Sequence, residues 1–199
     1  KFGPVRPSAD CVFICQDRIR EKSFISSLGI PIAPYFKIEN KSDLSKIPEN
    51  FPPSILKTAQ FGYDGKGQID ISTKKKLLDA VGELGNVPCV LEKKIDLTKE
   101  LSIILARDFS GNIVNYPVAE NHHKKGILDT SIMPGNVSQS VKDQIFQFAV
   151  KIIQHMNYCG VLCIEFFLSG NNIYVNELAP RPHNSGHQTI DACLCSQFE

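Results

Sequence analysis

Residues 57 to 70 read KTAQFGYDGKGQID and place three glycines and two lysines between two apolar runs. The flanking segments, PPSILKT at 52–58 and GQIDIS at 67–72, have the composition of β-strands, so the stretch predicts a glycine-rich hairpin. Glycine N–H groups can approach phosphate oxygens closely because no Cβ obstructs them. The stretch is not a Walker loop. In a Walker loop the lysine is followed by Ser or Thr and then by a helix, whereas Lys66 is followed by Gly67 and a strand pattern. A plain turn and a phosphate-binding loop both remain open from these residues alone.

The remaining sequence alternates strands and helices, with several hairpin signals. Residues 1–10 read as a connector, and residues 31–40 as an extended segment. Apolar spacing predicts a helix at 15–30 that ends at Gly29 and has Ile19, Phe24 and Leu28, with Lys22 or Ser23, near one face. Other helices are predicted at 42–48, 73–85 and 141–157, the last with an apolar face of Val141, Ile145, Phe148, Ile152 and Met156.

Further strands are expected at 87–95, in two runs within 100–123, and in a hairpin formed by 161–168 and 173–178. This order favours an α+β fold over a doubly wound parallel sheet. A break near residues 92–100 divides the chain into a small first lobe and a larger second lobe.

Bulk properties exclude several classes of function. The formal net charge of +1 gives no general attraction to nucleic acid or to an anionic membrane surface. The longest apolar runs, such as VLCIEFFL at 161–168, are much shorter than the roughly 20 residues of a membrane span. Seven cysteines without a CxxC pair indicate reduced thiols in a cytosolic compartment. The absence of an initiator Met and the abrupt start at Lys1 suggest a piece of a longer chain.

Two carboxylates and an amide form a candidate metal site. Glu165 lies in the first strand of the predicted hairpin, and Asn176 and Glu177 lie in the second. Regular pairing sets Glu165 opposite Asn176, and a one-residue offset or bulge brings Glu177 to the same end. These hard oxygen donors suit magnesium. The alternative is a pair of strands with solvated polar faces, which is disfavoured because Glu165 sits within an apolar run.

The segment APRPHNSGHQTI at 179–190 supplies a second cluster of polar groups. The guanidinium of Arg181 fits a carboxylate or phosphate, and His183 can move a proton near neutral pH. A zinc site formed by His183 and His187 is disfavoured, because no acid is near and the two prolines oppose a helix.

Together these segments resemble the ATP-grasp ligases, and specifically the 5-(carboxyamino)imidazole ribonucleotide synthetases of purine biosynthesis. The matching segments are QDR at 16–18, KTAQFGYDGKGQ at 57–68, KELSIILAR at 99–107, YPVAENHHKKGIL at 116–128 and NELAPRPHNSGHQTIDACLCSQFE at 176–199. The resemblance implies a helix from a preceding domain at 1–29, a small lid lobe at 30–95 and a large lobe at 96–199.

The resemblance also implies roles for individual residues. ATP would lie between the lobes, with its adenine read by the backbone between Glu92 and Ile95 and its ribose held by Glu100. Magnesium would bridge Glu165 and Glu177. The implied ATP-binding set is Lys57, Gly62, Gly65, Gly67, Glu92, Lys93, Ile95, Glu100, Asn176 and Arg18. Tyr63, Asp64 and Lys66 would contact the ribonucleotide, and the catalytic set holding bicarbonate would be Arg181, His183, Asn184 and Ser185.

In the reaction implied by this resemblance, ATP phosphorylates bicarbonate to carboxyphosphate, which carboxylates the exocyclic amine of 5-aminoimidazole ribonucleotide. A glycine-rich lid would exclude water from this labile species. Family members carry domains on both sides of this segment, so the isolated chain is expected to bind nucleotide weakly and to turn over little. The resemblance implies a cytoplasmic location and a homodimer for the full-length protein. Another ATP-grasp ligase and a non-catalytic ATP-binding module remain as alternatives.

Overall fold

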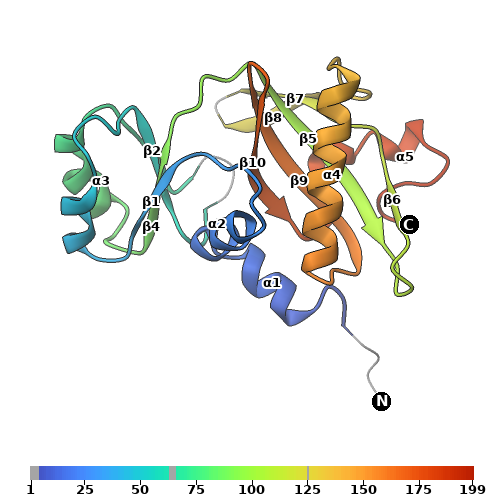
Figure 1. Cartoon of the computed structure of the whole chain (residues 1–199), viewed down its shortest axis with the longest axis horizontal. Helices are drawn as coiled ribbons and strands as arrows, with labels where there is room; N and C mark the ends of the chain where they lie inside the picture. Colours follow the sequence, from blue (N-terminus) through green and yellow to red (C-terminus); the bar gives the residue numbers. More distant parts are fainter. Residues whose placement is uncertain (1–4, 63–65, 125) are drawn as a thin grey trace.

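The chain folds around two β-sheets (Figure 1). The computed structural model of the protein describes residues 5–62, 66–124 and 126–199. One sheet has four strands in the order β1-β4-β2-β3, and the other has six, in the order β10-β9-β5-β7-β8 with β6 also paired to β5. These strand pairings are antiparallel throughout. The predicted α+β fold is confirmed.

The smaller sheet contains the strands predicted on both sides of the glycine-rich stretch. Its strands are β1 (Tyr35–Ile38), β2 (Ser54–Thr58), β3 (Gln68–Ile71) and β4 (Cys89–Lys93). β2 pairs with β3, with Lys57 opposite Gln68, so the predicted hairpin strands are confirmed. The predicted helices are also present, as the 3₁₀ helix η1 (Lys41–Lys46) and as the 3₁₀ helix η2 (Lys74–Lys76) leading into α3 (Leu77–Glu83). Leu77, Ala80 and Val81 of α3 pack on this sheet and form its core.

The larger sheet contains the predicted β9–β10 hairpin. Its strands are β5 (Lys99–Arg107), β6 (Ile113–Asn115), β7 (Ala119–Lys124), β8 (Ile127–Ile132), β9 (Gly160–Ser169) and β10 (Asn172–Ala179). Residues 100–123 form three strands instead of the predicted two; Pro117, which has no N–H for a ladder hydrogen bond, lies in the gap between β6 and β7. Strand β8 was not predicted, because ILDTSI at 127–132 shows little apolar alternation.

Helix α4 (Gln139–His155) determines the two faces of the larger sheet. Ile145, Ala149 and Ile152 of this helix are buried against apolar side chains of β5 and β9, including Leu101 and Ile103. The predicted apolar face of this helix is thereby confirmed. Successive strand residues point to opposite faces, so the residues between these apolar ones point away from α4. The face of the sheet opposite α4 is therefore the one that carries the polar site.

The N-terminal helical region differs from the prediction of one helix at 15–30. Two helices are present, α1 (Ala9–Cys15) and α2 (Arg18–Ser27), and α1 begins within the predicted connector. Asp17 interrupts them, because its carboxylate accepts hydrogen bonds from the N–H groups of Ile19 and Arg20 and caps α2. The predicted end of the helix at Gly29 is confirmed by its φ of +67°.

Helix α2 buries two charged residues, of which the predicted face included Lys22, as an alternative to Ser23, but not Glu21. Glu21 and Lys22 are 2% and 1% exposed, and Ile25 is fully buried. The helix contacts β10 of the larger sheet and β4 of the smaller one. The chain passes from one sheet to the other between Lys93 and Lys99, where the sequence predicts a lobe boundary. The division into 1–29, 30–95 and 96–199 stays a proposal.

Candidate functional site

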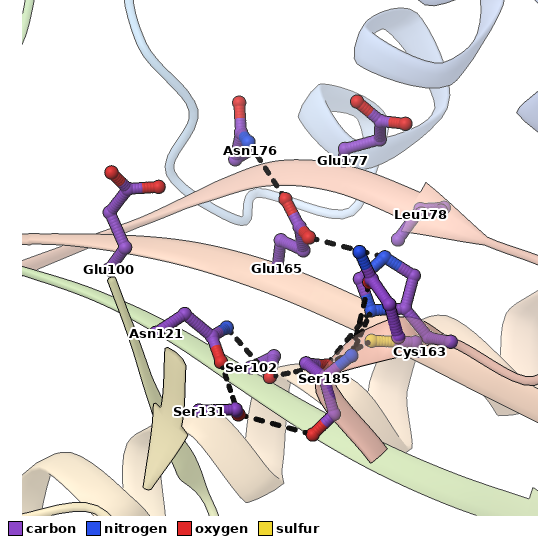
Figure 2. A network of polar contacts seen from close by, with 12 residues as sticks. Glu100, Ser102, Asn121, Ser131, Cys163, Glu165, Asn176, Glu177, Leu178 and Ser185 are labelled. Atoms are coloured by element: carbon purple, nitrogen blue, oxygen red, sulfur yellow. Dashed lines mark hydrogen bonds and ion pairs between the residues drawn. The ribbon is translucent and has the colours of Figure 1, made fainter. Parts of the chain in front are cut away.

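A β-bulge brings three oxygen-bearing side chains together on the β9–β10 hairpin (Figure 2). Asn172 pairs with Ser169, and a regular register from this turn would set Asn176 opposite Glu165. The register shifts between Val175 and Glu177, so Glu177 lies opposite Glu165 and Asn176 is the extra residue. The bulge alternative predicted from the sequence is confirmed.

The negative charge of Glu177 makes the carboxyl group of Glu165 harder to ionise. Burial, and then the negative charge of Glu177, raises the pKa of Glu165 to about 7. Asn176 Nδ2 donates to Glu165 Oε2 at 3.3 Å, while Asn176 Oδ1 is buried and has no hydrogen-bond partner among the described residues. Such an orphaned oxygen beside two acids fits a hard cation such as magnesium. Within the described ranges no group of three or more His, Cys, Asp or Glu side chains could hold a metal ion. The two carboxylates and the amide oxygen form a candidate donor set.

Arg18 at the start of α2 holds the second carboxylate. Its Nη1 lies 3.0 Å from Glu177 Oε2. A cavity of about 140 Å³ adjoins this pair, and its walls include Glu21 of α2 and Gly62 of the glycine-rich stretch. Burial, and then the charge of Glu177, raises the pKa of Glu21 to about 8. The structure thus brings the predicted residues Arg18, Gly62 and Glu177 together, and adds Glu21.

The loop after β10 brings a histidine to the carboxylate pair. His183 caps the 3₁₀ helix η3 (Asn184–Gly186), and its Nε2 lies 3.3 Å from Glu165 Oε1. Gly186 allows η3 to lie directly on β5, because a Cβ there would overlap Ile104. Burial, followed by the positive charge of Arg181, lowers the pKa of His183 to about 4. The imidazole is therefore neutral at pH 7.

The other members of the predicted catalytic set differ in exposure. Arg181 and Asn184 are exposed to solvent, and Arg181 Nη1 donates to the carbonyl of Pro182 at 2.9 Å. Ser185 is fully buried, and its Oγ lies 2.9 Å from His183 Nδ1. Ser185 therefore lies behind the histidine, whereas Arg181 is open to an incoming anion.

A buried three-residue charge cluster lies at the junction of α2 and the smaller sheet. Glu92 Oε2 is 3.2 Å from Lys57 Nζ, and Glu92 Oε1 is 3.3 Å from Lys22 Nζ. Burial acts to raise the pKa of Glu92, but the charges of Lys57 and Lys22 hold it below its usual value. Burial lowers the pKa of Lys57. Sequence reasoning missed the role of Lys22, although its position on the predicted apolar face of the helix was a signal that it is buried.

Two described glycines of the hairpin, Gly62 and Gly67, lie in close packing. Gly67 has a φ of +70°, and a Cβ there would lie 2.7 Å from Thr58 Oγ1. At Gly62 a Cβ would lie 3.3 Å from the carbonyl oxygen of Lys66. Tyr63, Asp64 and Gly65, which were predicted to contact ribonucleotide or ATP, lie outside the described residues.

Glu100 occupies a separate part of the same sheet face (Figure 2). It pairs with His123, whose Nδ1 is 2.9 Å from Glu100 Oε2, and this contact raises the pKa of His123. A cavity of about 220 Å³ adjoins the pair. His123 was not among the predicted site residues. Lys93 donates to the carbonyl of Phe51 at 2.6 Å, and Ile95 lies in the connection between the sheets.

The fold and site define a known class of nucleotide-dependent proteins. The sequence matches the ATP-grasp domain family over residues 23–198, so the chain belongs to the ATP-grasp family. It is similar to the N5-carboxyaminoimidazole ribonucleotide synthase of Bacillus subtilis strain 168, with 40% identity over 193 residues, covering 96% of this chain and 51% of that protein. The resemblance inferred from the sequence is confirmed at this level. None of the helices in the described part of the chain is long and apolar enough to cross a membrane.

Solved structures of related synthases share the fold. The Staphylococcus aureus N5-carboxyaminoimidazole synthetase complexed with ADP superimposes with a TM-score of 0.88 at 37% identity, covering 95% of this chain and 51% of that one. The Aspergillus clavatus enzyme in complex with ADP and 5-aminoimidazole ribonucleotide gives a TM-score of 0.87 at 27% identity, covering 97% and 52%. The chain thus spans about half the length of these relatives.

Proposed function

We propose that the protein containing this chain uses ATP and bicarbonate to carboxylate 5-aminoimidazole ribonucleotide in purine biosynthesis. The products would be 5-(carboxyamino)imidazole ribonucleotide, ADP and phosphate, with carboxyphosphate as the carrier of the carboxyl group. The observation that carries this proposal is the convergence of Glu165, Glu177 and His183 on one face of the larger sheet. The similarity to synthases that have been solved with ADP and with this ribonucleotide supports it.

In this proposal the nucleotide binds along the junction of the two sheets. The backbone from Glu92 to Ile95 faces the adenine, Glu100 faces the ribose, and Lys57 and Arg18 lie toward the phosphates. Glu165 and Glu177 would hold magnesium with Asn176 beside them, and the ion would offset the charge of the transferring phosphoryl group. The buried, unpartnered Oδ1 of Asn176 supports this donor set.

The acceptor side of the proposed site lies at the loop after β10. Arg181 would orient bicarbonate through its exposed guanidinium, with His183, Asn184 and Ser185 around it. Tyr63, Asp64 and Lys66 would contact the ribonucleotide. The proposal includes a cytoplasmic location and small-molecule substrates, without nucleic acid or membrane as partners. A homodimer of the full-length protein is a further proposal.

The test is release of ADP by the full-length protein with ATP and magnesium, with bicarbonate and the ribonucleotide omitted in turn. We expect release that depends on the ribonucleotide and, with both substrates present, formation of the carboxylated product. ADP release that ignores the ribonucleotide, in a folded protein that binds ATP, would overturn the proposed acceptor. The isolated 199-residue chain, assayed beside it, is expected to show little turnover.

A further inference from the structure

A chain of buried polar side chains runs beneath the carboxylate site (Figure 2). It begins at β8, where Ser131 Oγ lies 2.7 Å from Asn121 Oδ1 on β7. Asn121 Nδ2 lies 2.9 Å from Ser102 Oγ on β5, and Ser102 Oγ lies 3.0 Å from Ser185 Oγ on η3. Asn121 and Ser102 are 4% and 1% exposed. Neither side chain has a part in the function proposed above.

We propose that this chain of hydrogen bonds has a single direction, and that Asn121 and Ser102 are positioning residues for His183. The chain keeps the proton of the neutral imidazole on Nε2, which faces Glu165 Oε1 at 3.3 Å. His183 is then a hydrogen-bond donor toward the carboxylate, with Nδ1 as the acceptor atom.

A backbone group at the histidine end favours one direction of the chain, and the side chains further along stabilise that direction. The N–H of Ser185 lies 3.3 Å from His183 Nδ1 and can only donate, although it shares its proton with Asn184 Oδ1 at 3.0 Å. A proton on Nδ1 would point at the proton of the Ser185 N–H group, and the two would repel each other. Nδ1 therefore accepts, and Ser185 Oγ, 2.9 Å away, uses its one proton to donate to it.

Each hydroxyl has one proton, so the direction is passed along the chain. Ser185 Oγ has given its proton to the histidine and must accept from Ser102. Ser102 has then used its own proton and must accept from Asn121, which therefore presents Nδ2 to it. Asn121 Oδ1 is left facing Ser131, whose hydroxyl donates to it at 2.7 Å and also lies 3.2 Å from the carbonyl oxygen of Ser185. Cys163 Sγ, at 3.8 Å from Ser185 Oγ, can add a donor without changing this order.

The consequence is that His183 donates a hydrogen bond that orients one oxygen of Glu165, a proposed metal ligand. Nε2–H faces Oε1, while Oε2 accepts from Asn176. Partners of this kind orient metal-binding carboxylates, and their loss typically costs roughly 10–100-fold in metal affinity or activity. This functional consequence rests on the proposed function, whereas the tautomer of His183 does not.

The direct test is the tautomer of His183 in the ligand-free full-length protein, read from long-range ¹H–¹⁵N NMR spectra after ¹⁵N-histidine labelling. His183→Gln assigns the signal by its disappearance. We expect a pyridine-like Nδ1 and a pyrrole-like Nε2. A pyrrole-like Nδ1 in the spectrum of the unaltered protein would overturn the proposal.

The positioning role is tested with Asn121→Leu, which keeps approximate volume but removes both polar groups. Without the amide of Asn121, only the shared N–H of Ser185 favours one direction of the hydroxyl chain, so the ¹⁵N shifts of His183 should move toward a mixture of tautomers. Ser131→Ala, a smaller change, should produce the same drift by releasing the amide of Asn121. The matched control is Ser54→Ala, because Ser54 is a fully buried strand serine of the smaller sheet whose hydroxyl has no hydrogen-bond partner in the described part of the chain. Unchanged His183 shifts in a folded Asn121 or Ser131 variant would refute the positioning role.

A second readout is the magnesium concentration that gives half-maximal ADP release. We expect this concentration to rise roughly 10–100-fold in Asn121→Leu and to stay unchanged in Ser54→Ala. An unchanged magnesium requirement together with altered ¹⁵N shifts would confirm the directed chain and refute its role toward Glu165. If the protein releases no ADP in response to the ribonucleotide, the proposed function fails, and the NMR result still decides the direction of the chain.

Discussion

Lys22 and Lys57 bind opposite oxygens of a single buried carboxylate, that of Glu92, at 3.3 and 3.2 Å. The two lysines come from α2 and β2, so the carboxylate joins the N-terminal helix to the smaller sheet. The cluster has two positive charges and one negative charge. Its members are therefore not equivalent, since loss of either lysine leaves a balanced pair and loss of the carboxylate leaves two unpaired cations.

Glu92→Gln is expected to destabilise the protein more than Lys22→Met. The first change leaves two buried ammonium groups without their shared carboxylate, which should cost about 3–5 kcal/mol in the free energy of unfolding. The second removes one charged contact and should cost about 1–3 kcal/mol. Urea unfolding followed by circular dichroism measures both values. Equal losses would contradict the shared-carboxylate arrangement.

Glu177→Gln is expected to reduce magnesium-dependent ADP release by more than about 100-fold. The effect should exceed that of Asn121→Leu, because Glu177 is a proposed ligand of the metal itself. Glu83→Gln is the matched control, since Glu83 lies exposed at the end of α3. Steady-state ADP release over a magnesium titration checks the expectation. Retention of most of the turnover by Glu177→Gln would show that Glu177 does not bind the ion.

Glu21 should make stability depend on pH. Its pKa is about 8 in the folded protein against 4.5 for an ordinary glutamate, so the folded state binds the extra proton. The resulting stabilisation is complete below about pH 4.5 and is lost as the pH rises through 8, at about 1.4 kcal/mol per pH unit for one group.

Glu21→Gln tests this dependence, because the amide oxygen can still accept from the N–H of Leu178. The difference between wild-type and variant stability should grow in favour of the variant between pH 5 and pH 8, as Gln cannot ionise. Chemical unfolding at several pH values gives this difference curve. The raised pKa of Glu165 gives the wild type and the variant a similar pH dependence of stability, which cancels in their difference. A flat difference curve would contradict the raised pKa of Glu21.

Two glycine substitutions should have opposite effects on stability. Gly67→Ala is expected to destabilise by more than about 1 kcal/mol, because of its positive φ and the 2.7 Å approach of a Cβ to Thr58 Oγ1. Gly82→Ala should stabilise by roughly 0.5–1 kcal/mol, since Gly82 lies in α3 with open space around it. Thermal unfolding of both variants measures the contrast. Tolerance of alanine at Gly67 would mean that the hairpin backbone can relax there.

The parts of the fold that could be predicted depend on local pattern. The α4 helix follows from its apolar spacing. Counting residues outward from the hairpin turn sets Asn176 opposite Glu165, and only the bulge, which the sequence left open as an alternative, brings Glu177 there. Lys22, Asn121 and Ser102 could not be assigned in this way, because each meets its partners only in the folded protein. Lys22 is 70 residues from Glu92 in sequence, and Ser102 is 83 residues from Ser185. Asn121 is 19 residues from Ser102 and 10 from Ser131. The break at Asp17 was missed because a good N-cap residue also fits inside an amphipathic pattern.

The bulge on β10 lets two consecutive residues, Asn176 and Glu177, serve the same face of the sheet, which a regular strand cannot do. Removing the codon for Asn176 would restore regular pairing with Glu177 still opposite Glu165. The hairpin could therefore gain or lose the amide donor by a single in-frame insertion or deletion, while both acids stay where they are. The number of oxygen donors on this hairpin can therefore change while the pairing of its two acidic residues stays the same.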